Sequence, residues 1–192
     1  YGARDLVARF STENAKLLGT HVVPAAGPLA VRPDGTLAAI SDGRVVTVAG
    51  DKVTPWLTTH LDEPVGLAVA DDGTACVANR GALQNVSVFA ADGSFQRSIG
   101  KRGGRPAMGA YDPAGMYMPG GMAVDTKGRL WVAETADGPK RISVWNTSHG
   151  KNVAEYFGGS GYFGYGYINP DEPNMMYAHH VLWEVDWQSY QC

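Results

Sequence analysis

Three segments of the sequence repeat one pattern, and this repetition limits the folds open to the chain more than any other feature. They span residues 29–41, 67–79 and 122–134, and each reads as a short apolar strand, a tight turn and a second strand. The turn contains a glycine in every copy: Gly35, Gly73 and Gly128. Because the turn between two paired strands needs a positive φ, a glycine at this point is typical of a β-hairpin. The repeat therefore predicts a series of antiparallel hairpins.

Each hairpin is followed by two more strands in the same order. The third strands are expected at 45–48, 86–89 and 142–145, and the fourth strands at 53–57, 95–99 and 153–157. Four short antiparallel strands that recur at a period of about 40 residues are typical of a propeller blade. The high count of 25 glycines and 11 prolines agrees with many tight turns. We therefore predict an all-β fold, a β-propeller of four-stranded antiparallel blades.

The repeat also divides the chain into units. Residues 1–22 are expected to form the outer strands of a preceding blade, and residues 161–192 the start of a further blade. Between them we predict these units: blades at 23–60, 61–100 and 121–160, with a long inter-blade loop at 101–120. About three full blades and two partial ones make an incomplete propeller, whose end blades would expose apolar faces. The remaining blades are expected in missing sequence or in another chain.

The third copy resembles an NHL repeat. Its sequence Pro119-Gly-Gly-Met-Ala-Val-Asp, followed by Val132-Ala-Glu-Thr and Arg141-Ile-Ser-Val-Trp, matches the family's pattern of P-x-G-[IM]-A-V-D, V-A-[DE]-T and R-[IV]-x-V-[FW] in order. The second copy is a looser match, and the first departs from the pattern at Pro28 and Ser41. The resemblance implies a propeller architecture and leaves the activity open, because one fold carries many functions.

Composition and charge exclude two classes of partner. The formal net charge is −3, and acidic and basic residues are interleaved. Nucleic-acid binding needs a basic surface that neutralises phosphates, so no nucleic-acid partner is expected. No apolar run approaches the roughly 18 residues of a membrane span, so none is predicted. Two cysteines, Cys76 and Cys192, do not form a disulfide framework.

The long loop is the leading candidate for a binding surface. Long loops in compact domains are often functional, although this one could instead pack over its own blade. Its candidate contact residues are Arg102, Arg105, Tyr111, Asp112 and Tyr117. Two residues at equivalent strand ends, Asn79 and Glu134, join this candidate set. For these two, a structural ion pair or a turn hydrogen bond is the commoner role.

The sequence predicts a binding or scaffold module within a larger extracellular or periplasmic protein, with a protein or carbohydrate ligand. No catalytic set is recovered, and no cofactor is assigned. No metal site is predicted, because the histidines form no cluster with ligand spacing: His21, His60, His149, His179 and His180. The resemblance implies an alternative, since NHL-like amidating lyases hold zinc with histidines from several blades. That alternative is a metal-dependent lyase or hydrolase with its site at the propeller channel, drawing on Asn79, Glu134 and a histidine.

Overall fold

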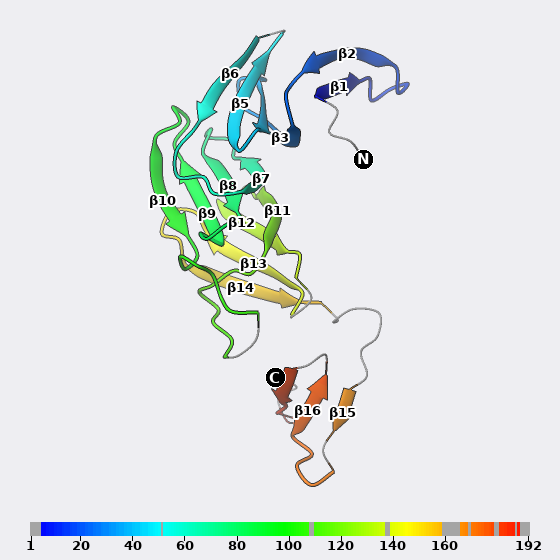
Figure 1. Cartoon of the computed structure of the whole chain (residues 1–192), viewed down its shortest axis with the longest axis vertical. Coiled ribbons are helices and arrows are strands. Elements are labelled where there is room, and N and C mark those ends of the chain that lie inside the picture. Colours follow the sequence, from blue (N-terminus) through cyan, green and yellow to red (C-terminus); the bar gives the residue numbers. More distant parts are fainter. Residues whose placement is uncertain are drawn as a thin grey trace.

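The fold consists of short antiparallel strands joined by turns (Figure 1). The computed structural model describes these residues: 5–50, 52–107, 110–136, 139–158, 166–168, 170–178, 181–186 and 188. Within them the chain forms strands β1 to β17 and no helix. The described part accordingly contains no helix with the length and apolar content required to cross a membrane. The all-β class predicted from the repeat is confirmed.

Three four-stranded sheets follow one another along the chain, and in each the strands hydrogen-bond in chain order. Blade 1 consists of β3 (Ala26–Val31), β4 (Leu37–Ser41), β5 (Arg44–Ala49) and β6 (Lys52–Leu57). Blade 2 consists of β7 (Pro64–Val69), β8 (Ala75–Asn79), β9 (Asn85–Phe89) and β10 (Phe95–Ile99). Blade 3 consists of β11 (Pro119–Val124), β12 (Arg129–Glu134), β13 (Arg141–Asn146) and β14 (Asn152–Phe157). The predicted third and fourth strands are confirmed, within one residue at each end.

Two smaller sheets flank the blades. At the N-terminal side, β1 (Leu6–Phe10) pairs antiparallel with β2 (Leu17–Val22). At the C-terminal side, β15 (Gly166–Ile168), β16 (Met175–Ala178) and β17 (Val181–Glu184) form a three-stranded sheet. The predicted division of the chain at 22, 60, 100, 120 and 160, and the assignment of the flanking strands to partial blades, stay predictions.

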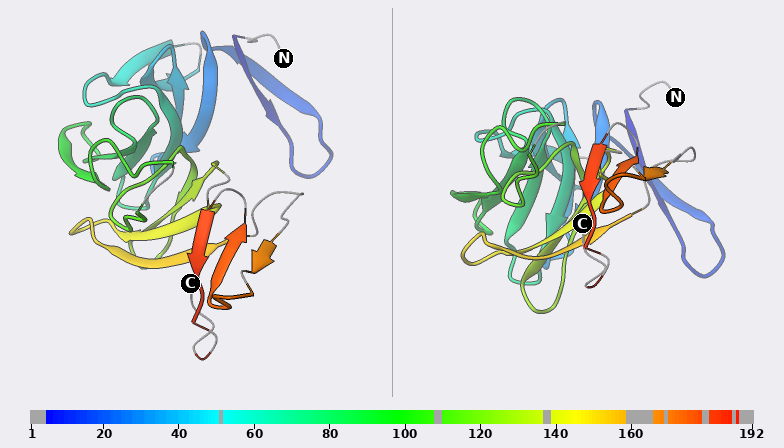
Figure 2. Two further views of the ribbon diagram at one scale, coloured as in Figure 1. Left: turned by 60° about the horizontal axis from the view of Figure 1, so that its bottom comes forward. Right: turned by 90° about the horizontal axis from the view of Figure 1, so that it is seen from below.

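The blades are arranged around an arc, with the first strand of each on the inside (Figure 2). Strand β7 contacts both β3 and β11, so these first strands lie side by side. Apolar side chains fill the space between successive blades. Between blades 2 and 3 the core contains Val86, Leu130 and Trp145, and between blades 1 and 2 it contains Val45 and Phe89. A middle strand such as β8 is therefore buried along its whole length, because a blade covers each of its faces.

Blades 2 and 3 approach each other closely where β7 meets β11. A Cβ atom on Gly66 would lie 2.1 Å from the carbonyl oxygen of Gly120. No side chain fits in that space, so glycine at position 66 is what allows the two inner strands to approach each other. The packing of blade 2 on blade 3 thus depends on a residue with no side chain.

Cys76 lies on β8 within the core between blades 2 and 3 and is 0% exposed. Burial, with a smaller contribution from Asp72, raises the pKa of its thiol to about 12. Because the thiolate is the reactive form, we expect iodoacetamide to leave Cys76 unmodified in the native chain and to alkylate it in urea. Peptide mass mapping distinguishes alkylation of Cys76 from alkylation of Cys192. Alkylation of Cys76 under native conditions would contradict its buried position. Cys192 lies outside the described residues.

Candidate functional site

The long connection from β10 to β11, residues 100–118, folds back on itself and packs against the blades. The amide of Lys101 donates to the carbonyl of Ala114 at 2.7 Å, and the amide of Arg105 donates to the carbonyl of Met116 at 3.0 Å. The Met116 side chain is completely buried in the core between blades 2 and 3. Gly104 has a φ of +68°, and a Cβ at this position would meet the Met116 carbonyl oxygen. The described part of this 100–118 loop is therefore an ordered element with its own backbone pairing.

A buried carboxylate anchors the loop to blade 3. The Glu134 side chain, at the end of β12, is 0% exposed. One of its oxygens accepts hydrogen bonds from the Arg105 guanidinium and from the Tyr117 amide, each at 2.9 Å. The other oxygen accepts from the Arg141 guanidinium at 2.9 Å. A buried charge is tolerated only when paired and hydrogen-bonded, and here one carboxylate holds two loop residues and one strand residue together.

Arg141 extends this network to the outer strand of the blade. Its guanidinium donates to the carbonyls of Gly115 at 2.6 Å and Pro113 at 2.8 Å, and it pairs with Glu155 on β14. The Tyr111 hydroxyl donates to Glu155 at 2.8 Å. Burial, followed by this hydrogen bond, raises the pKa of Tyr111 well above its usual range. The part of the loop around Tyr111 is thus fixed to β14.

The loop carries an aromatic and cationic cluster on this base. The Arg105 guanidinium lies 5.7 Å from the ring centroids of both Tyr111 and Tyr117. These distances suit cation–π attraction. Tyr111 is 44% exposed and Tyr117 is half-buried. Arg105 therefore orients two tyrosines, at least one of which presents much of its surface to solvent.

The predicted contact residues differ in exposure. Arg102 is exposed, and Asp112 is half-buried and paired with Lys101 at 2.8 Å. That hydrogen bond from Lys101, followed by one from the Ala114 amide, lowers the pKa of Asp112. Counted as whole residues with their backbone, Arg105, Glu134 and Asn79 are buried, at 4%, 6% and 0% exposure. The structure therefore brings Arg102, Tyr111, Asp112 and Tyr117 to or near the surface and places the other three candidates beneath it.

Asn79 and Glu134 occupy one position of the repeat, and Ser41 is its equivalent in blade 1. Each bonds to the segment that leads into its own blade. The Ser41 hydroxyl donates to the carbonyl of Pro24 at 2.6 Å, and Asn79 accepts from the amide of Asp62 at 2.9 Å. Glu134 accepts from the amide of Tyr117 in the same way. Of these three equivalent residues, only Glu134 in blade 3 is charged. Its charge is paired with Arg105, which lies in the long connection from β10 to β11.

Neither Arg141 nor Glu155 was among the predicted contact residues, although a structural ion pair was the commoner role expected for Glu134, and Glu134 does pair with Arg141. Arg141 is the arginine of the family-like R-[IV]-x-V-[FW] string, which offered a signal. Glu155 offered none, because its bond to Tyr111 joins residues 44 positions apart. Such a contact exists only after the loop has folded against β14.

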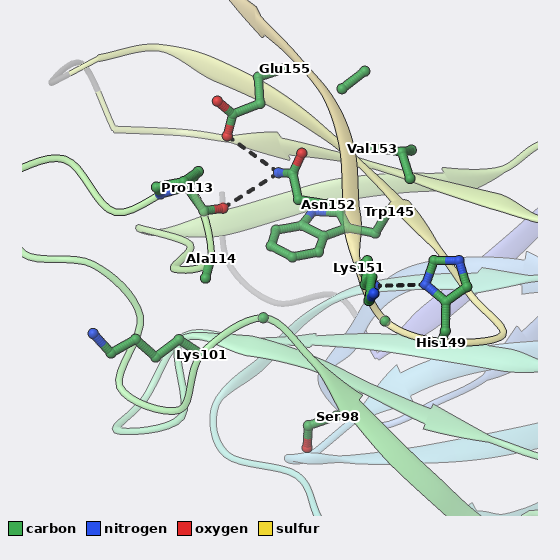
Figure 3. Close-up of a pocket in the computed structure, with 13 residues that line it drawn as sticks. Ser98, Lys101, Pro113, Ala114, Trp145, His149, Lys151, Asn152, Val153 and Glu155 are labelled. Carbon is green, nitrogen blue, oxygen red and sulfur yellow. Dashed lines mark hydrogen bonds between the residues drawn. The ribbon is translucent and has the colours of Figure 1, made fainter.

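An open cleft lies beside the loop, between the outer strands of blades 2 and 3 (Figure 3). Its volume is about 680 Å³. Its walls are the end of β10, loop residues 101, 113 and 114, and the continuous run 149–155, with Trp145 behind them. Asn152 donates to the Pro113 carbonyl at 3.4 Å and to Glu155 at 3.2 Å, which links the two walls (Figure 3). Sequence reasoning gave no indication of this cleft.

Many solved structures have a similar fold, among them the following two. One is a chain in the crystal structure of a nidogen/laminin complex, with a TM-score of 0.63 and 16% sequence identity over 94% of this chain and 76% of that chain. This chain has a β-propeller fold. The other is a protein of unknown function from Bacteroides caccae, with a TM-score of 0.57 and 9% identity over 98% of this chain and 67% of that chain. Identities this low establish the fold alone.

Sequence comparisons add no family. No protein-family model matches the sequence, and a search of curated proteins finds no match. The NHL resemblance therefore stays a prediction. Across the described ranges, no three His, Cys, Asp or Glu side chains come together in a grouping that could hold a metal ion.

Proposed function

We propose that this propeller segment binds a protein partner through the exposed side of the 100–118 loop. Arg102, Tyr111 and Tyr117 supply the contacts, and Asp112 contributes at the edge. Arg105, Glu134, Arg141 and Glu155 act as positioning residues. The observation that carries the proposal is the buried Glu134 carboxylate, which ties the loop to the blade through Arg105 and the Tyr117 amide.

The energetics of the network favour a loop whose shape matters. Burying charges costs free energy that a solvated surface loop would not incur. The chain nevertheless buries three charged side chains between this loop and blade 3, at Arg105, Glu134 and Arg141. Because ordering a flexible loop opposes association, a loop fixed in advance favours binding. Tyrosine and arginine are also the residue types that dominate the energetics of protein interfaces.

The choice of a protein as partner has one further support. The nidogen/laminin structure is a complex of two proteins, and one of its chains has a fold similar to this one. The carbohydrate ligand, the extracellular or periplasmic location and the lyase or hydrolase alternative stay predictions from the sequence.

We further propose that additional blades complete the propeller. The face of blade 3 that points away from blade 2 carries Ile142 and Tyr156, which are 44% and 53% exposed. Trp131 stacks on Tyr156 at a centroid distance of 5.6 Å and widens this apolar surface. A neighbouring blade would bury it, as blade 2 buries the opposite face.

Photocrosslinking tests the binding surface even while the partner is unidentified. Benzoylphenylalanine is introduced in place of Arg102 or Tyr111, and the protein is irradiated in an extract of the source cells. The control is the same group in place of Asp71, an exposed residue in the β7–β8 turn at the opposite end of blade 2. We expect positions 102 and 111 to capture one common protein that position 71 does not capture.

A second arm links capture to the loop residues. Tyr117→Ala in the position 102 protein should strongly reduce the yield of the crosslinked species. The proposal would be overturned if position 71 captured the same protein with equal yield. It would also be overturned if Tyr117→Ala left the yield of crosslinking from positions 102 and 111 unchanged.

A further inference from the structure

The cleft beside the loop runs along a free strand edge. β14 is the last strand of blade 3, so one side of its backbone has no partner strand within the described residues. The cleft is lined by the continuous run 149–155, which includes the first four of the six residues of β14. A register shift opposite Trp145 leaves Val153 without a paired residue on β13, and Val153 is 51% exposed. An edge strand that borders a cleft can pair with an extended peptide from another chain.

The charges around the cleft favour an acidic occupant. Lys101 and Lys151 line it, and Glu155 is the only acidic residue among the described residues of its walls. That carboxylate is already compensated by Arg141 and accepts hydrogen bonds from Tyr111 and Asn152. Lys151 forms no ion pair with any described residue, whereas Lys101 is paired with Asp112. Lys151 is therefore the main uncompensated charge on the wall.

We propose that this cleft binds an extended acidic peptide that adds a strand to the free edge of β14. A carboxylate of the peptide faces Lys151, and the backbone of the peptide pairs with β14. This site rests on the proposed function only in that the partner is a protein. It would be a second contact surface, next to the exposed side of the 100–118 loop.

The geometry favours a peptide over an anionic polysaccharide. A strand edge offers alternating N–H and C=O groups, and only a polypeptide backbone matches both. The floor of the cleft is also preformed, because the Trp145 indole N–H donates to the Ser143 hydroxyl at 2.8 Å and fixes the ring. A polyanion held by charge alone would not use either feature.

Titration followed by two-dimensional ¹⁵N–¹H NMR of this chain tests the proposal. The probe is an alternating Glu-Thr octapeptide, and its matched controls are the Lys-Thr octapeptide and a Glu-Thr octapeptide N-methylated at alternate residues. We expect the Glu-Thr peptide to shift amide resonances of residues 149–155 and 98–101, with an affinity that falls as salt rises. The Lys-Thr and N-methylated peptides should leave these resonances unmoved.

A charge reversal provides the second arm. Lys151→Glu should weaken peptide binding by roughly tenfold or more, while Lys127→Glu, an exposed lysine in the β11–β12 turn of the same blade, should not change it. Equal binding of the N-methylated peptide, or equal binding of a sulfated oligosaccharide at the same resonances, would overturn strand addition. No shift at residues 149–155 would overturn the site. The NMR titration of the cleft is independent of the crosslinking experiment at position 102. A failure of the proposed loop surface would therefore be distinguished from a failure of the cleft proposal.

Discussion

Replacing Glu134 with alanine is expected to lower the free energy of unfolding by about 3–5 kcal/mol. The change removes the carboxylate that pairs with the buried Arg105 guanidinium, and it removes one of the two carboxylates that pair with the buried Arg141 guanidinium. It also leaves the Tyr117 amide without its acceptor. Urea unfolding followed by tryptophan fluorescence measures the effect.

The matched control is Glu13→Ala, which removes an exposed carboxylate in the β1–β2 turn. A surface substitution of this kind should change the free energy of unfolding by less than about 0.5 kcal/mol. A Glu134→Ala effect as small as that of the control would mean that the buried network does not hold the loop against blade 3.

Gly66→Ala is the second large effect, with an expected loss of about 3 kcal/mol of folding free energy. The added Cβ would lie 2.1 Å from the Gly120 carbonyl oxygen, so β7 and β11 would have to separate. The clash involves backbone on both strands, which relaxes less readily than a side chain. The same urea unfolding experiment measures the loss.

Gly121→Ala is the control for this substitution, because it places the same methyl group on β11 where nothing lies within 4 Å. We expect no loss there, or a gain of a few tenths of a kcal/mol from reduced freedom of the unfolded chain. If Gly66→Ala and Gly121→Ala behaved alike, the close contact between blades 2 and 3 would be refuted.

The strands could be predicted from the sequence because local turn chemistry and the repeat agree. Gly35, Gly73 and Gly128 have φ values of +81°, +85° and +69°, as the predicted hairpin turns require. Apolar residues of the repeated strands fill the space between successive blades, so every copy of the pattern predicts the same kind of strand. Agreement between local and repeated patterns is what makes a fold readable from one sequence.

The candidate site was only partly predictable. The long loop and its tyrosines stand out by length and composition, but the sequence pattern favours a surface position for Arg105, because arginine is rarely buried. Its burial depends on Glu134, which is 29 positions away in the sequence. The cleft escaped prediction for a related reason, since it forms between the edges of β10 and β14, which belong to different blades.

Hydrogen exchange of the free chain tests most directly whether the 100–118 loop is a preformed surface. The amides of Lys101, Arg105 and Tyr117 are hydrogen-bonded within the network, so their exchange should be slower than in an unstructured peptide by roughly a hundredfold or more. Glu134→Ala should remove the protection at Tyr117. Exchange of these three amides at unstructured rates in the unmodified chain would show that the loop is not held in place, and it would contradict the proposed binding surface.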